Sequence, residues 1–323
     1  MQKRTLALFE LLVATAVWGM GFVATIWALK IWSAAEVTVL RFFFATLPAA
    51  FYFLFSKSTL LDIKLESRLS FWPGLYLALT MVLQTIGLNF TTPAKSAFIT
   101  TTYVVIVPLL LHFLKDKVSL RHWIWVFVAL LGTYFVSGAF EAVGFKLGDI
   151  PTILCAFGAA LHILSLDKVA QKSKNSIIFG ITQSFWALIF CLVFLAIESL
   201  IDPGINLKIF HFEFIKIFDF KNYLNTVTNF DHTTFLAWAG ILSLAFGSTV
   251  IGFTLQVRAQ KDISASLASV LFLLEAPMAF LFSYLFLHEM MSGLQWVGAI
   301  LILASCIGSI TFSQKLLAKN KVS

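Results

Sequence analysis

Long apolar stretches separated by short polar connections run through the whole chain. Roughly 20 apolar residues in helical form cross the hydrocarbon core of a bilayer, and stretches near that length recur here. A helix satisfies its own backbone hydrogen bonds, so it is the form that such a stretch takes in lipid. The spans predicted in this way are 6–29, 34–55, 71–90, 96–114, 122–140, 150–166, 177–198, 234–257, 263–287 and 293–313. The pattern predicts an all-α integral membrane protein of ten transmembrane helices.

The composition supports the same class of protein. Apolar residues make up 59% of the chain and charged residues 12%, with a mean hydropathy of +0.91. Soluble domains carry about twice that share of charge. The first apolar run is longer than the core of a signal peptide and lacks a small-residue cleavage site, so we expect it to remain as the first helix. The cysteines, Cys155, Cys191 and Cys306, all fall in predicted spans and indicate neither a disulfide framework nor a metal site.

The basic residues predict how the chain is oriented in the membrane. With the N-terminus in the cytoplasm, most of the 23 Lys and Arg residues fall on the cytoplasmic side, as the positive-inside rule requires. Among the exceptions, Lys208, Lys216 and Lys221 share one long loop, which counts weakly. An even number of helices then places both termini in the cytoplasm. The net charge of +7 is thus explained by topology, and we expect no nucleic-acid partner.

The two halves of the chain resemble each other. Thr92–Pro108 matches Lys261–Pro277 in length, in a hydroxyl-rich start and in a closing proline, and each is followed by a polar turn and a Trp-containing helix. With five helices in each half, the second copy enters the membrane from the opposite side, which makes an inverted repeat of the kind that builds many transporters. We therefore expect a first repeat over 1–140 and a second over 141–323, with a long periplasmic loop at 202–231.

A set of short motifs carries a family resemblance across nearly the whole chain. They are Ala16-Val17-Trp18-Gly19, Val39-Leu40-Arg41-Phe42, Thr91-Thr92-Pro93-Ala94-Lys95-Ser96-Ala97-Phe98-Ile99, Leu273-Leu274-Glu275-Ala276-Pro277 and Leu287-His288-Glu289. With these motifs on ten helices, the chain resembles the drug/metabolite transporter (DMT) superfamily, and specifically the bacterial EamA-domain permeases.

This resemblance implies both an architecture and a range of substrates. Helices 1 to 4 and 6 to 9 would surround a central cavity in a bacterial inner membrane, and helices 5 and 10 would lie outside it. Relatives move amino acids, other small metabolites, nucleotide sugars and drugs. The 202–231 loop departs from the family pattern because it is longer and more aromatic, and its segment 207–220 is expected to be an interfacial helix or a short hairpin.

Ionisable residues inside predicted spans are the strongest site candidates, because they are costly in lipid and are kept for function or for pairing. Glu275 lies near the middle of helix 9, at the position that corresponds to Ile106 in the first repeat. It is also the candidate for proton coupling. Arg41 lies in helix 2, where snorkelling or a fixed ion pair is an equal alternative. The predicted substrate-binding residues are Trp18, Arg41, Gln84, Tyr103, Gln183 and Glu275.

Other polar and aromatic residues are weaker candidates on the same helices, because packing and interfacial positions explain most of them. They are Thr100, Thr101, His162, Trp186 and Gln256, with Lys95 at the outer entry to helix 4. Pro108 and Pro277 lie at corresponding depths in the two repeats, where they can act as static kinks or as bends for alternating access.

The function predicted is secondary transport of a small metabolite by alternating access. An intramembrane enzyme is disfavoured, because the chain has no zinc-binding His-Glu-x-x-His, nucleophile elbow or phosphate-binding loop, and we expect no metal or cofactor. A channel would favour a more polar lining. Export of amino acids or related metabolites, with possible proton coupling, is favoured over uptake of a scavenged metabolite or cofactor. Opposite charges at membrane depth suit a zwitterion, carried by a monomer or a homodimer.

Overall fold

The structure is a computed structural model of the chain. It describes residues 2–48, 52, 58–88, 90, 93–114, 119–136, 147–201, 231–288, 290 and 292–322. The predicted boundary between repeats at residue 140, the loop at 202–231 except its last residue, and the segment 207–220 lie outside the described residues.

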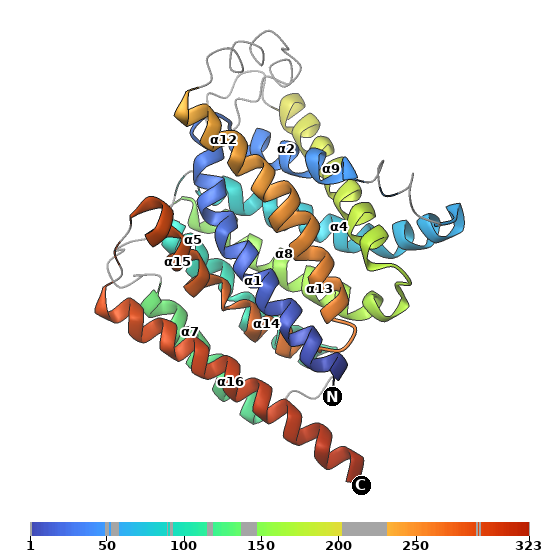
Figure 1. Cartoon of the computed structure of the whole chain (residues 1–323), viewed down its shortest axis with the longest axis vertical. Helices are drawn as coiled ribbons and strands as arrows, with labels where there is room; N and C mark the ends of the chain where they lie inside the picture. Colours follow the sequence, from blue (N-terminus) through green and yellow to red (C-terminus); the bar gives the residue numbers. More distant parts are fainter. Residues whose placement is uncertain are drawn as a thin grey trace.

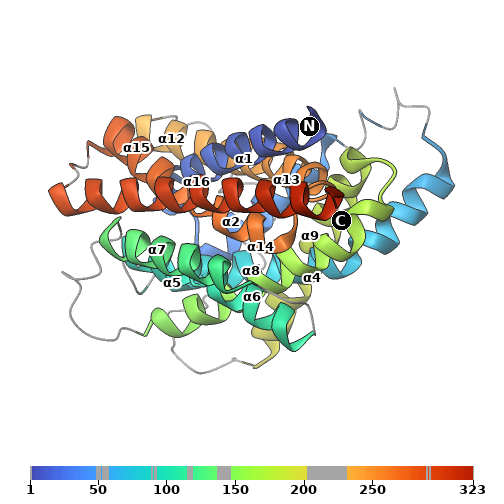
Figure 2. The same ribbon diagram turned by 90° about the horizontal axis from the view of Figure 1, so that it is seen from below.

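The described chain is helical throughout and contains no strand. Figures 1 and 2 show the helices gathered into one bundle of long, tilted rods. The helices are α1 Gln2–Ala28, α2 Ala34–Thr46, α4 Leu60–Leu88, α5 Pro93–Thr101, α6 Tyr103–Phe113, α7 Leu120–Val136, α8 Asp149–Val169, η1 Ala170–Lys172, α9 Ser176–Ile201, α12 His232–Leu242, the π-helix η2 Ser243–Gly252, α13 Phe253–Ala259, α14 Ala265–Phe272, α15 Glu275–Leu287 and α16 Gly293–Val322.

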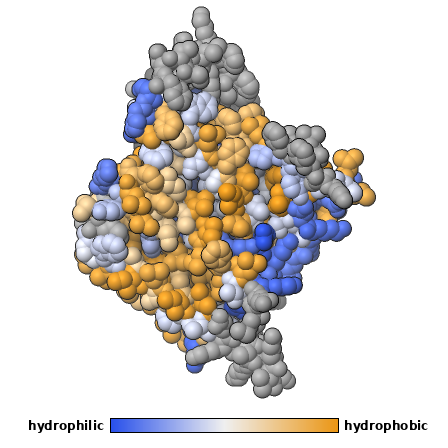
Figure 3. Space-filling model, in the orientation of Figure 1, coloured by the Kyte–Doolittle hydropathy of each residue, from blue (hydrophilic) through white to orange (hydrophobic). Residues whose placement is uncertain are grey.

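Seven helical segments of the described chain are long and apolar enough to cross a membrane, and two shorter apolar helices lie at Phe98–Phe113 and Leu120–Val136. The all-helical membrane fold is therefore confirmed. The count of ten crossings stays a prediction, since α2 is described only as a short helix. Figure 3 shows apolar side chains over most of one face, as expected of a surface that meets lipid.

Polar residues at the ends of the apolar stretches start several helices. Ser33 and Glu36 form a reciprocal capping box at the start of α2. At the start of α16, the Ser292 side chain accepts from the Gln295 N–H, and the Gln295 side-chain oxygen accepts from the Ser292 N–H. Such caps satisfy backbone donors that no helical partner can reach. They place the helix starts close to where the sequence turns from polar to apolar.

Helix α4 begins well before the span predicted to start at residue 71. Its first turns carry Asp62, Lys64, Glu66 and Arg68, which are too polar for a lipid-embedded segment but form a regular helix. The predicted span thus covers only the apolar part of a longer rod. Pro73 lies inside this helix.

Two predicted spans are broken helices. The first breaks at Thr102, between α5 and α6, and the second at Leu273 and Leu274, between α14 and α15. Each break precedes the proline noted in the sequence, Pro108 or Pro277. A proline lacks the N–H that would bond four residues back and its ring crowds that carbonyl, so Pro277 weakens the helix at Leu273, whereas Pro108 acts at Val104, two residues after the break at Thr102.

The most extensive packing joins helices from the two halves of the chain. Helix α4 packs against α8 and α9, while α1 packs against α12, η2, α13 and α15. Helices α7 and α16 form a separate pair along one side of the bundle (Figure 1). Gly132 and Gly298 face each other across that pair, and a Cβ on Gly132 would meet the Gly298 carbonyl oxygen at 2.8 Å. Two glycines therefore let the α7 and α16 backbones touch.

Candidate functional site

A cavity of about 100 Å³ lies at the centre of the bundle, between helices of both halves. Its walls come from α1, α2, α4, α5 and α6 on one side and from α8, η2, α13, α14 and α15 on the other. Since a water molecule needs on the order of 10–15 Å³ by this kind of measure, the cavity has room for several waters or a small ligand. Its polar or charged lining residues are Thr25, Thr38, Arg41, Thr80, Gln84, Thr85, Thr100, Tyr103, His162, Ser248, Gln256 and Glu275.

Arg41 is held in the cavity wall by the π-helix. Its Nε donates to Thr249 Oγ1 and its Nη2 to Ser248 Oγ, both at 2.7 Å. The third contact runs from Nη1 to the Met81 sulfur at 3.1 Å. All three partners are uncharged, so none of them is a counter-ion to the guanidinium group. Arg41 is 9% exposed, which excludes snorkelling to the surface.

Trp18 closes one side of the cavity. Its Nε1 donates to the Ser248 carbonyl at 3.0 Å, and its ring packs 5.3 Å from Phe253 and 5.2 Å from Phe272, measured between centroids. Gly252 of the π-helix leaves space for this ring, because a Cβ there would collide with the indole. The aromatic wall is thus fixed by packing on three helices rather than by α1 alone.

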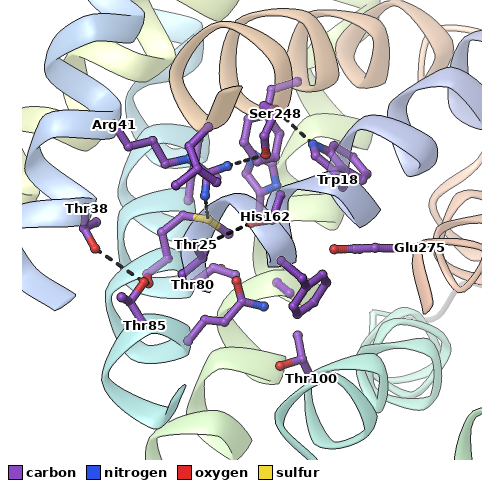
Figure 4. Close-up of a pocket in the computed structure, with 18 of the residues that line it drawn as sticks. Trp18, Thr25, Thr38, Arg41, Thr80, Thr85, Thr100, His162, Ser248 and Glu275 are labelled. Atoms are coloured by element: carbon purple, nitrogen blue, oxygen red, sulfur yellow. Dashed lines mark hydrogen bonds between the residues drawn. The ribbon is translucent and has the colours of Figure 1, made fainter. Parts of the chain in front are cut away.

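Glu275 is the acidic residue among the described residues that line the cavity. It is the first residue of α15, directly after the break, and its side chain is partly exposed toward the cavity. Figure 4 shows Glu275 and Arg41 reaching the cavity from different sides. They do not form an ion pair, and no described residue hydrogen-bonds to the Glu275 carboxyl group. The cavity therefore presents separate positive and negative groups.

Several buried polar atoms in the cavity wall have no hydrogen-bond partner among the described residues. They are Tyr103 Oη, His162 Nε2 and Gln256 Oε1. Leaving a buried polar group unpaired costs roughly 1–3 kcal/mol, so such groups in a native wall call for a partner. A bound solute with hydrogen-bonding groups would supply it. Across the described residues, no cluster of His, Cys, Asp or Glu side chains is arranged to hold a metal ion.

Five of the six substrate-binding residues predicted from the sequence line this one cavity: Trp18, Arg41, Gln84, Tyr103 and Glu275. Gln183 does not. It is fully buried in α9, where its carbonyl lies against Gly74 of α4, and neither amide atom of its side chain has a hydrogen-bond partner among the described residues. The close approach of α4 and α9 puts the backbone of this turn in a helix interface, and the side chain lies beside His162 without itself lining the cavity.

The weaker candidates divide in the same way. Thr100, His162 and Gln256 line the cavity, whereas Thr101 and Trp186 do not, and the Lys95 side chain lies outside what the structure describes. Sequence reasoning missed the hydroxyl residues that line it, which are Thr25, Thr38, Thr80, Thr85 and Ser248. Helical spacing is the signal that finds them once one lining residue is known, since Trp18, Gly21, Phe22 and Thr25 follow the i, i+3, i+4, i+7 pattern of one helix face.

Beyond the cavity, polar contacts between distant segments tie together the end of the bundle where both termini lie. Glu10 of α1 pairs with Arg258 of α13 at 2.7 Å. Gln256 donates to Gln260 at 2.9 Å, and Gln260 in turn donates to the Ile163 carbonyl at 3.0 Å. We call this region the closed end.

Two further contacts belong to the closed end: Asp167 accepts from the Ala265 N–H at 2.9 Å, and the Glu66 carboxylate accepts from the Lys174 N–H at 2.7 Å. At the opposite side, which we call the open end, the cavity lining runs out to Thr25, Val37 and Leu88. The polar contacts described between distant segments therefore gather at the closed end of the cavity.

A helical membrane protein whose two halves enclose a charged, partly unsatisfied cavity has the features of a small-molecule carrier. The chain matches the EamA-like transporter family over residues 5–138 and again over residues 146–311. It is also 30% identical over 308 residues to an uncharacterized transporter of Archaeoglobus fulgidus, with 94% of this chain and 86% of the relative covered. This chain therefore belongs to the EamA-like transporter family, and the resemblance seen in the sequence is confirmed.

The fold has a counterpart among solved structures. A protein crystal structure superposes with a TM-score of 0.70 over 95% of this chain and 98% of that chain, at 14% sequence identity. At so low an identity, the likeness extends to the fold alone. The family membership makes the chain a multi-pass membrane protein of transporter type with two repeats, and points away from an enzyme.

Proposed function

We propose that the protein is a secondary transporter that moves a small zwitterion, an amino acid or a related metabolite, across a bacterial inner membrane by alternating access. One observation carries the proposal: the cavity offers Arg41 and Glu275 as opposite charges that form no direct ion pair, while the hydrogen bonds of Arg41 go to neutral groups. A zwitterion carries the complementary pair, and each of its charges needs a partner once water is removed.

The binding mode follows from the groups available on each side. The substrate carboxylate would contact Arg41, whose guanidinium is already oriented by Ser248 and Thr249 and loses little freedom on binding. The substrate ammonium would contact Glu275. Trp18 would cover the apolar part of the solute.

Transport requires the cavity to open at the closed end and to shut at the open end. The contacts at the closed end are individually modest, so they can break without unfolding a helix. The helix breaks before Pro108 and Pro277 provide points where half-helices can tilt. We propose that both termini are cytoplasmic, which places the open end at the periplasmic face, and we propose export as the direction of transport.

Glu275 is also the group that we propose to couple transport to a proton gradient. Its carboxyl group would hold a proton on one face of the membrane and release it when the substrate ammonium arrives beside it. Glu275→Gln keeps the size and the hydrogen bonding but cannot change charge. This variant is therefore expected to retain exchange of substrate for substrate and to lose accumulation driven by a proton gradient.

The test uses purified protein in proteoliposomes, with radiolabelled amino acids, nucleosides and cofactors offered with and without a pH gradient. Arg41→Gln should reduce transport of the zwitterionic substrate at least about tenfold, because a buried carboxylate would lose its charged partner. Glu36→Gln is the matched control, since it makes the same change as Glu275→Gln outside the cavity and glutamine still completes a capping box.

Three outcomes would overturn parts of this proposal. Undiminished gradient-driven transport by the Glu275→Gln variant would leave Glu275 as a structural polar group. Transport of a cofactor or another non-zwitterionic metabolite, inward only, would favour the alternative of an importer. If thiol reagents that cannot cross the membrane labelled a cysteine placed at Lys172 but not one at Lys30, in intact spheroplasts, the orientation would be reversed.

A further inference from the structure

A second hollow lies on the side of the bundle, separate from the central cavity. It has a volume of about 1070 Å³, roughly ten times that of the cavity, and shares no lining residue with it. Helices α4 and α6 each pack on α8 but make little contact with each other (Figure 2). The hollow is a groove between α4 and α6, with α8 as its floor. Leu161 and Leu164 line this groove, whereas Ala159 and His162 line the cavity, so α8 separates the two spaces.

The groove is charged at one end and apolar along its length. Lys64 and Arg68, in the first turns of α4, and Lys168, in the last turn of α8, line the charged end, and all three side chains are exposed. No acidic residue belongs to the described lining, and none of the three cations pairs with a carboxylate of the described chain. The charge is therefore available to an anionic ligand.

An aromatic and aliphatic surface continues from the cations. On α4, Lys64, Arg68, Trp72 and Tyr76 follow one another at four-residue spacing and so share one face of the helix, with the Trp72 and Tyr76 rings stacked 6.1 Å apart. The α6 wall is apolar and ends at Phe113, which is 79% exposed. This arrangement offers a head-group site that leads directly into a surface suited to hydrocarbon.

The length of the groove fits one leaflet of a bilayer. Lys64 and Tyr76 are separated by 12 positions on α4, or roughly 18 Å at the rise of an α-helix. One leaflet of the hydrocarbon core is about 15 Å deep. A ligand with a phosphate at the cations and a chain along the groove would therefore lie in the position of an ordinary phospholipid of that leaflet.

We infer that this groove is a binding site for an anionic phospholipid, with its phosphate between Lys64, Arg68 and Lys168 and one acyl chain along α8. Basic residues between helices at a membrane surface recognise anionic head groups, each contributing through attraction to the negative charge. A zwitterionic lipid of the same chains would lose most of this attraction. The site is therefore selective for the head group, while its apolar lining accommodates the chain.

The first test measures lipid binding by native mass spectrometry of the delipidated full chain, titrated with phosphatidylglycerol or phosphatidylcholine of the same acyl chains. The variant Lys64→Gln, Arg68→Gln, Lys168→Gln should bind phosphatidylglycerol at least about tenfold more weakly, with little change for phosphatidylcholine. The control Lys3→Gln, Arg121→Gln, Lys172→Gln removes the same number of exposed Lys and Arg residues outside the groove and should stay within about twofold of wild type.

The second test locates the lipid by tryptophan quenching in vesicles that contain dibrominated phosphatidylglycerol or dibrominated phosphatidylcholine at equal mole fraction. Trp72 and Trp296 are similarly exposed, at 57% and 59%, but only Trp72 lines the groove. Because Trp186 also lines the groove, the excess quenching by phosphatidylglycerol should fall in Trp72→Phe, vanish when Trp186 is changed to Phe as well, and persist in Trp296→Phe. This readout needs no change to the charged residues.

Specific results would overturn the inference. Unchanged phosphatidylglycerol binding by the groove variant, or an equal loss in the control variant, would show that no specific site exists there. Displacement of phosphatidylglycerol by inorganic phosphate at equal concentration would indicate a phosphate site without a chain. Displacement by the transported solute would make the groove part of the transport route.

Discussion

The two ends of the central cavity are built differently. At the closed end, an ion pair between Glu10 and Arg258 and several hydrogen bonds, such as that of Asp167 with the Ala265 backbone, join segments far apart in the sequence. At the open end, several hydroxyl side chains donate to carbonyls of their own helices, as Thr25 does to Gly21 and Thr38 to Ala34. Contacts between segments resist separation, whereas contacts within a helix do not. The difference indicates which end has to break its contacts for the cavity to change face.

Locking the closed end should have the largest effect. In a variant with alanine at the three native cysteines, Glu10→Cys and Arg258→Cys can be joined by a short, reducible bifunctional thiol reagent. Transport is expected to fall at least about tenfold and to return on reduction, because α1 and α13 could no longer separate. The measurement is solute flux in proteoliposomes, and Arg258→Cys alone, treated with the reagent, is the control. Full transport after complete cross-linking would show that this end does not open.

Removing one ion pair at the closed end should have a smaller effect. The Glu10 side chain is 8% exposed and that of Arg258 49%, so the pair is partly screened and contributes on the order of 1 kcal/mol. Glu10→Gln should therefore raise the labelling rate of a cysteine placed at the buried Ile263 about fivefold. The charge swap Glu10→Arg with Arg258→Glu should restore the low rate. An unchanged labelling rate in Glu10→Gln would show that this ion pair does not help to keep the closed end shut.

Weakening a contact at the open end should change the labelling rate of a cysteine at position 263 by less than about twofold. Thr38 and Thr85 join α2 to α4 through a long hydroxyl contact of 3.4 Å, while each hydroxyl also donates to a carbonyl in its own helix at 2.8 Å or 2.7 Å. Replacing both by Val loses little between helices. A large rise in Ile263→Cys labelling would contradict the contrast between the two ends.

The smallest effect concerns a helix start beside the open end. Asp231 caps α12 by accepting from the Thr234 N–H at 2.8 Å, and the backbone and side-chain hydrogen bonds of Thr234 hold the Asp231 pKa below its ordinary value. Because the pKa is lower in the folded state, the carboxylate fully stabilises the cap at any pH above the ordinary pKa near 3.9. This stabilisation is lost as the pH falls through the lower pKa of the folded state.

Hydrogen exchange of the first α12 amides should therefore be steady, after correction for intrinsic rates, from about pH 8 to pH 5, and should quicken only in stronger acid. Asp231→Asn keeps a capping oxygen but does not titrate, so its exchange should lack the acid-dependent rise. The same acid-dependent rise in the asparagine variant would assign the effect to another group.

Much of the fold could be read from local features of the sequence. Apolar length predicted where helices lie, because lipid forces each backbone to bond within its own segment. Apolar length did not predict the full extent of helices that begin with charged residues. The first turns of α4, with Lys64 and Arg68, form a helix although they are too polar to be predicted as a membrane span. The breaks beside Pro108 and Pro277 could be expected from the prolines, but not their position at Thr102 and at Leu273 and Leu274.

Site residues could be predicted from the sequence where burying them in the membrane costs free energy. Arg41 and Glu275 are expensive at membrane depth, and that expense alone made them candidates. Gln183 gave a similar signal and lies elsewhere, because a neutral amide can be buried in a helix interface as readily as in a cavity. The Ser248 and Thr249 hydroxyls that hold Arg41 gave no signal, since such residues also serve plain helix packing.

The sequence by itself determined the class of protein, the helical fold, the family and the two charges of the cavity, because these depend on transfer from water to lipid, residue by residue. Only the tertiary structure decided that five of six predicted residues line one cavity, that Trp18 and Arg41 are positioned by a π-helix, and that the described polar contacts between distant segments gather at one end of that cavity. Those features depend on which helix faces meet, and the meeting of faces is set by packing between segments more than a hundred residues apart, which no local pattern records.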